Sequence, residues 1–191
     1  MLTQSPSQTV GPFFHYGLFF GGENVLVNEQ TADQPILIKG RVLDGDGQPI
    51  PDAMVEIWQA DAQGRFNHPA DPQQAQADPH FRGFGRAETT GPGNQFVFQT
   101  VKPGAVAWDA ERKQAPHINV RVFARGMLIH AYTRLYFGDE RDANGADPVL
   151  NLVEVARQPT LIAQLEKTAG LPTYRFDIVL QGVGETVFFD P

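Results

Sequence analysis

Cysteine is absent from this chain of 191 residues, and serine occurs only at Ser5 and Ser7. A chain without cysteine forms no disulfide, thiolate metal site or cysteine nucleophile. Neither serine lies in the G-x-S-x-G pattern of a hydrolase nucleophile. Basic residues are in the minority, and the formal net charge is −7. This charge argues against a nucleic-acid partner, because binding to a phosphate backbone requires a basic surface.

Long apolar runs are missing as well. No stretch approaches the roughly 18 consecutive apolar residues of a membrane span, so we expect no membrane partner. The first ten residues, MLTQSPSQTV, have neither the basic nor the apolar region of a secretory signal, and we therefore expect a cytoplasmic protein. The length fits one domain with its own hydrophobic core.

Short apolar segments separated by glycine and proline predict an all-β fold. The segments lie at 35–44, 53–58, 95–101, 114–137, 173–180 and 185–189, with turns expected at 124–126 and 181–184. We expect one short helix near 160–167 and a long irregular loop over 59–94. About seven strands without alternating helices favour a β-sandwich or barrel over a parallel α/β sheet.

The apolar residues among the first 34 positions show no regular spacing, and we interpret this segment as an arm. Its run from Phe13 to Phe20 is too apolar for a free tail. The arm could pack on the chain's own domain or on a second chain. We therefore divide the chain into an arm, 1–34, and a single β-sandwich domain, 35–191.

The segment from 114 to 137 carries two polar ladders, because alternate residues of a strand point to the same face. They are His117, Asn119 and Arg121 on the first strand and His130, Tyr132, Arg134 and Tyr136 on the second. Such a face could meet water, a partner chain or an active site. One hypothesis is a metal site of His117, His130 and a carboxylate, although no H-x-H or H-x-[DE] spacing occurs.

Several motifs in a fixed order resemble the intradiol ring-cleavage dioxygenases. They are SPSQTVGPF at 5–13, EIWQADAQGRF at 56–66, FRGFGR at 81–86, TVKPG at 100–104, APHINV at 115–120, RLYF at 134–137, and YRFDIVLQG and GETVFFD near the end. The resemblance implies a transthyretin-like (prealbumin-like) β-sandwich with long loops and one or two short helices. It also implies chemistry in which a non-haem Fe(III), bound by two tyrosines and two histidines of the catalytic chain, supports cleavage of a catechol ring by O₂.

Most of the implied iron-ligand positions hold unsuitable side chains in this sequence. Phe66 and Val106 stand at the two tyrosine positions, His117 at the first histidine position, and Asn119 at the second. Gln114 stands where the catalytic chains have an arginine. A single imidazole is no iron site. We therefore expect no metal and no catalytic residue in this chain alone. We call the four ligand positions, Phe66, Val106, His117 and Asn119, vestigial.

The missing ligands make the chain resemble the non-catalytic alpha chains of the family. This implies a homologous, iron-bearing beta subunit as partner, within a higher-order alpha/beta oligomer. The arm, in particular Thr9, Val10, Gly11 and Pro12, is then expected at the subunit interface, lining the substrate entrance together with Arg134.

The implied substrate is protocatechuate, cleaved with O₂ to 3-carboxy-cis,cis-muconate. Its carboxylate would find a planar, permanently charged partner in the Arg134 guanidinium. The other interpretation of Arg134 is an ordinary ion pair, for example with Asp177 or Glu56.

Two other functions remain open from the sequence. One is a non-catalytic β-sandwich module that binds a small molecule or a protein. The other is an independent enzyme that uses His117 and His130. A neighbouring reading frame with the motifs G-R-Y, K-P-G-x-Y and H-I-H would favour the enzyme subunit over the binding module.

Overall fold

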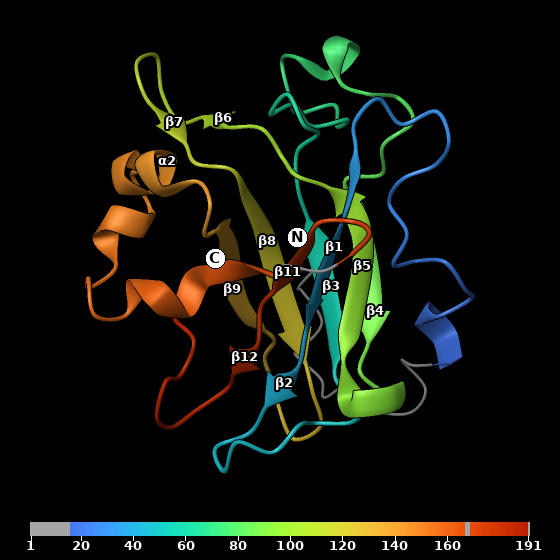
Figure 1. Cartoon of the computed structure of the whole chain (residues 1–191), viewed down its shortest axis with the longest axis vertical. Coiled ribbons are helices and arrows are strands. Elements are labelled where there is room, and N and C mark those ends of the chain that lie inside the picture. The colour runs from blue at the N-terminus through green and yellow to red at the C-terminus, as the bar shows by residue number, and fades with distance from the viewer. Residues whose placement is uncertain (1–15, 167–168, 191) are drawn as a thin grey trace, which may run out of the picture.

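The computed structural model of this chain describes residues 16–166 and 169–190. Eight strands form one sheet in the order β4-β3-β8-β9-β10-β11-β1-β5 (Figure 1). Their bounds are β1 Pro35–Gly40, β3 Met54–Trp58, β4 Phe84–Glu88, β5 Phe96–Val101, β8 His117–Phe123, β9 Ala131–Phe137, β10 Ile162–Glu166 and β11 Thr173–Arg175. Two short ladders join β2 Val42–Leu43 to β12 Ile178–Val179 and β6 Val106–Ala107 to β7 Lys113–Gln114.

The helices are short. They comprise α2 Arg141–Ala146, the 3₁₀ turns Gln74–Gln76, Pro92–Asn94, Leu150–Leu152 and Gln158–Leu161, and a helical stretch at 16–18. In Figure 1, α2 and the turns that follow it lie beside β9, across the molecule from β4 and β5. None of the described helices has the length and apolar content needed to cross a lipid bilayer. The all-β class is as predicted.

The two halves of the sheet enclose one hydrophobic core. Strands β3, β8 and β9 contribute Val55, Val120 and Leu135, while β1 and β5 contribute Ile38 and Phe98, and all five side chains are buried in the same cluster. Strands at opposite ends of the sheet order share this core, so the sheet folds over on itself as a sandwich. The other face of β8 and β9 is left for the polar ladders, because side chains alternate along a strand.

Residues 22–26 join the two outermost strands, β4 and β5. The Leu26 amide donates to the Gln99 carbonyl of β5 at 2.8 Å, and the Arg86 amide of β4 donates to the Glu23 carbonyl at 3.0 Å. The Leu26 side chain is 1% exposed and belongs to the main core. This part of the arm packs on its own domain and covers sheet edges that would otherwise be unpaired. The arm residues Thr9 to Pro12 lie outside the described residues.

Most predicted strands are confirmed, but the turn between β8 and β9 is longer than predicted. The Met127 amide reaches the Ala124 carbonyl at 3.3 Å, and Gly126 has a φ of +79°. However, β9 begins only at Ala131. Leu128 and Ile129 are about 70% exposed and lie outside the ladder.

The helix predicted near 160–167 is wrong, because the segment from Ile162 to Glu166 is strand β10. It pairs in parallel with β9 and antiparallel with β11, and so links the two halves of the sheet. Leu161 and Ala163 are buried at alternate positions. The local spacing of Leu161, Ile162 and Leu165 fits a helix, but pairing with two neighbouring strands decides the conformation.

The prediction that 173–180 and 185–189 form a hairpin of two strands across the turn at 181–184 is also wrong. β11 pairs in parallel with β1, and β12 in parallel with β2. Residues 185–189 form no strand, although the Thr186 amide donates to the Val179 carbonyl at 2.9 Å. Strand β4 lies inside the predicted loop, where Gly83 and Gly85 obscure the strand pattern, and its pairing with β3 stabilises it.

Replacing Leu26 by alanine tests the role of residues 22–26. The variant should lose about 2–5 kcal/mol of unfolding free energy, because the truncation leaves a cavity in the core between β4 and β5. Urea denaturation measures the change. Leu128→Ala is the matched control, and its 70% exposed side chain predicts a change within about 0.5 kcal/mol. Equal effects of the two variants would contradict the packing of this segment.

Candidate functional site

The polar ladders of β8 and β9 lie on one face. The directly opposite pairs are His117 with Tyr136, Asn119 with Arg134, and Arg121 with Tyr132. Opposite residues of an antiparallel pair project to the same side, which confirms the predicted arrangement for these six residues. His130 is the exception, because it precedes β9.

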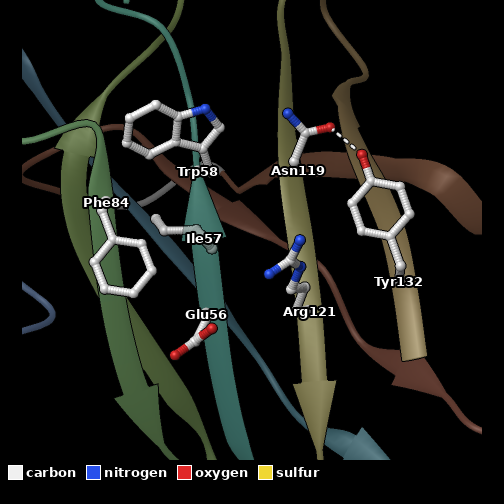
Figure 2. Close-up of a pocket in the computed structure, with 7 residues that line it drawn as sticks. All are labelled: Glu56, Ile57, Trp58, Phe84, Asn119, Arg121 and Tyr132. Carbon is white, nitrogen blue, oxygen red and sulfur yellow. Dashed lines mark hydrogen bonds between the residues drawn. The ribbon is translucent and has the colours of Figure 1, made fainter. Parts of the chain in front are cut away.

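The same face continues across β3 and β4 as two rows of residues. One row is Phe84, Trp58, Asn119 and Arg134, and the next is Arg86, Glu56, Arg121 and Tyr132. A cavity of about 280 Å³ lies on this face. In Figure 2 the Trp58 and Phe84 rings lie at one side of it and Tyr132 at the other. The Tyr132 hydroxyl donates to Asn119 Oδ1 at 2.7 Å.

The structure brings the vestigial positions together. Phe66 stacks on Trp58 with ring centroids 5.7 Å apart, and both line a second cavity of about 420 Å³ together with Val106. Trp58 lies directly opposite Asn119, and His117 is two residues before it on the same face of β8. Residues far apart in the sequence therefore meet at one end of the polar face.

This donor set does not fit ferric iron. Phe66 and Val106 have no ligating atom, and Asn119 Oδ1 accepts the hydroxyl of Tyr132. Only His117 has a side chain suited to iron, and one imidazole is no iron site. Within the described ranges, no cluster of three or more His, Cys, Asp or Glu side chains could hold a metal ion.

The His117 ring is buried, with 5% of its surface exposed, and is held by the backbone. Its Nδ1 lies 2.8 Å from the Ala115 carbonyl oxygen, so the neutral ring donates from this nitrogen. Burial lowers the pKa of His117, and the positive charge of Arg134 lowers it further, to about 4. The hydrogen bond to Ala115 and the charge of Asp147 oppose this shift without cancelling it.

His130 lies at the other end of the strand pair. Its ring packs on Phe123 with centroids 5.4 Å apart. Phe123 is six residues after His117 on β8, which corresponds to about 20 Å along a strand. The hypothesis of a metal site shared by His117 and His130 is therefore wrong.

Arg134 is half-buried and is held by uncharged groups. Its Nη1 donates to Gln114 Oε1 at 2.8 Å and to the Tyr136 hydroxyl oxygen at 3.5 Å. The carboxylates considered as its partners are engaged elsewhere. Asp177 pairs with Arg175 at 2.7 Å, and Glu56 pairs with Arg86 at 2.7 Å. An ion pair of Arg134 with Asp177 or Glu56 is thus wrong.

Sequence reasoning missed Asp147, which organises this end of the face. Its side chain is fully buried. It accepts the Ala115 amide and the Tyr136 hydroxyl at 2.7 and 3.2 Å, and the amides of Val149 and Leu150 at 2.9 and 2.7 Å. An aspartate bonded to amides two and three residues on is a common turn motif, so the run D-P-V-L gave a local signal. The contact of Asp147 with Tyr136 left no signal in the sequence.

Comparisons with known proteins identify the family of this chain. The dioxygenase family model matches residues 11–182. The protocatechuate 3,4-dioxygenase alpha chain of Burkholderia cepacia is 48% identical, over 99% of this chain and 98% of that protein. The beta chain from the same organism is 34% identical, over 84% of this chain and 70% of that protein. The 3-chlorocatechol 1,2-dioxygenase structure from Rhodococcus opacus 1CP superposes with a TM-score of 0.60 and 20% identity, over 94% of this chain and 68% of that chain.

The chain belongs to the intradiol ring-cleavage dioxygenase family, whose members depend on iron. Within the family it is similar over its full length to a protocatechuate 3,4-dioxygenase alpha chain. The solved structure supports the sandwich fold alone.

The depressed pKa of His117 predicts a pH dependence of stability. The unfolded state takes up a proton near pH 6.5 and the folded state only near pH 4, so this contribution is present above pH 6.5 and is lost as the pH falls. His117→Asn should remove it. Between pH 7 and 5, the wild type should lose about 2 kcal/mol more unfolding free energy than the variant.

Urea denaturation at the two pH values measures this difference. His80→Asn, which alters an exposed histidine of the 59–94 segment, should keep the pH dependence of the wild type. Parallel stability curves for wild type and His117→Asn would show that the imidazole is not held neutral.

Proposed function

We propose that this chain is the alpha subunit of a protocatechuate 3,4-dioxygenase. It assembles with a homologous beta chain, and the complex cleaves protocatechuate with O₂ to 3-carboxy-cis,cis-muconate. The beta chain carries the Fe(III), and this chain completes the wall of the substrate site. The similarity to an alpha chain over the full length and to a beta chain over most of it supports the pairing.

One observation carries the division of labour between the chains. The vestigial positions gather at one end of the polar face, and three of the four, Phe66, Val106 and Asn119, hold side chains that do not suit Fe(III). The sandwich is thus retained while the donor atoms are not. A chain of this kind contributes surface and charge to a partner's site and not a metal of its own.

Arg134 is the residue proposed to act on the substrate. Its half-buried guanidinium has no carboxylate within 4.0 Å among the described residues. A carboxylate-bearing catechol supplies such a partner, whereas catechol itself does not. Thr9, Val10, Gly11 and Pro12 are proposed to line the same entrance. The cytoplasmic location and the higher-order oligomer stay predictions from the sequence.

Reconstitution tests the proposal. The chain should co-purify with a co-expressed beta subunit of the family, and the pair should consume O₂ with protocatechuate while this chain alone should not. An oxygen electrode measures the consumption of O₂, and the loss of aromatic absorbance measures the cleavage of protocatechuate. Turnover by this chain alone would contradict the proposal.

Arg134→Ala in the alpha/beta complex tests the role of the charge. The KM for protocatechuate should rise about 10- to 100-fold, because a charge-assisted hydrogen bond contributes about 1.5–3 kcal/mol. The KM for catechol should stay within about twofold, because catechol has no carboxylate. Steady-state kinetics on both substrates provides the comparison.

Arg121→Ala is the matched control, since Arg121 lies on the same face in the next row. It should leave the ratio of the two KM values unchanged. An equal rise of KM for protocatechuate and catechol in Arg134→Ala would remove the charge-pairing argument.

A further inference from the structure

The Arg134 guanidinium is oriented without being neutralised. Its acceptors, the Gln114 amide oxygen and the Tyr136 hydroxyl oxygen, carry no formal charge. Both bonds use Nη1. A guanidinium has five N–H donors, and the Tyr132 hydroxyl is a third uncharged partner of the Arg134 side chain, so donors remain for a further acceptor. The N–H donors that remain can bind a carboxylate through charge-assisted hydrogen bonds.

The Tyr136 side chain is held in place from the interior of the protein. The side chain is fully buried, and its hydroxyl donates to Asp147 Oδ1 at 3.2 Å. Burial raises the pKa of the Tyr136 phenol, and the nearby charge of Asp147 acts in the same direction, so the phenol keeps its proton. A protonated phenol donates to Asp147 and accepts from Arg134, so the arginine is linked to a buried carboxylate without touching it.

Gln114 is fixed by the same carboxylate. It is 8% exposed and lies on β7, opposite Val106 of β6. The amide of the next residue, Ala115, donates to Asp147 Oδ2 at 2.7 Å. The two oxygens of Asp147 therefore hold two of the groups that contact Arg134, Gln114 through the backbone and Tyr136 through the phenol.

We propose that Gln114 and Tyr136 are positioning residues for Arg134. They hold its remaining N–H donors toward the substrate carboxylate while leaving its charge uncompensated. This inference rests on the proposed function, in which Arg134 selects a carboxylate-bearing catechol. Uncharged acceptors are essential to it, because a carboxylate in place of either would bind the guanidinium itself and compete with the substrate.

Gln114→Glu in the alpha/beta complex is the direct test. The substitution keeps the size and shape of the side chain but places a carboxylate 2.8 Å from Nη1. The KM for protocatechuate should rise about tenfold, while kcat and the KM for catechol stay within about twofold. Competitive inhibition by 4-hydroxybenzoate should weaken by a similar factor, and inhibition by phenol should not change.

Tyr136→Phe provides a second test. It removes a hydroxyl that orients the Arg134 guanidinium and introduces no charge. The KM for protocatechuate should rise about threefold to tenfold, with a smaller change in kcat. Tyr174→Phe is the matched control. It removes another buried hydroxyl that donates to an aspartate, Asp139, at 2.9 Å, but has no contact with Arg134. It should leave the ratio of the KM values for the two substrates unchanged.

The outcomes separate this inference from the proposed function. If Arg134→Ala fails to discriminate between the substrates, the substrate-side role of Arg134 is wrong. If Arg134→Ala discriminates but Gln114→Glu leaves the ratio of the KM values unchanged, Arg134 selects the substrate without the proposed positioning. An equal rise of both KM values in Gln114→Glu would also overturn the inference, because it would show a structural effect. Gln114→Glu keeps the test decisive even if Tyr136→Phe does not fold.

Discussion

The pairing of β8 with β9 determines what this face of the molecule can do. Its register sets Asn119 opposite Arg134 and His117 opposite Tyr136, and a shift of either strand by one residue would turn the two side chains of that strand into the core. The register is in turn maintained by the buried apolar set on the other face, including Val120 and Leu135. Core packing and the polar face are thus two consequences of one hydrogen-bond ladder.

Two different features leave this end of the face without the donor set of an iron site. Phe66 and Val106 remove the donors outright and fill the space with apolar surface. His117 keeps a donor, but burial and the neighbouring guanidinium favour the neutral ring bonded to the backbone. The carboxylate of Glu56 on this face pairs with Arg86, and Asp147 orders the surroundings of Arg134 from the interior. This arrangement is the basis for proposing that Arg134 pairs with an incoming carboxylate.

Strand alternation was enough to predict the sandwich, the core strands and the shared face of β8 and β9, because period-two patterning reflects which side is buried. It failed where partners distant in sequence decide the structure. Strand β10 forms because β9 and β11 are available on either side of a segment with helical spacing. The link from Asp147 through Tyr136 to Arg134 depends on a loop folding back on β9, for which no local pattern exists.

The central claim is that this chain lends Arg134 to an iron site that it does not itself contain. Metal analysis of this chain alone and of its complex with the beta subunit, both prepared with ferric iron present, tests it most directly. We predict stoichiometric iron in the complex and none in the isolated chain, with or without the His117→Ala substitution. Stoichiometric ferric iron on the isolated chain, lost on replacing His117, would contradict the account.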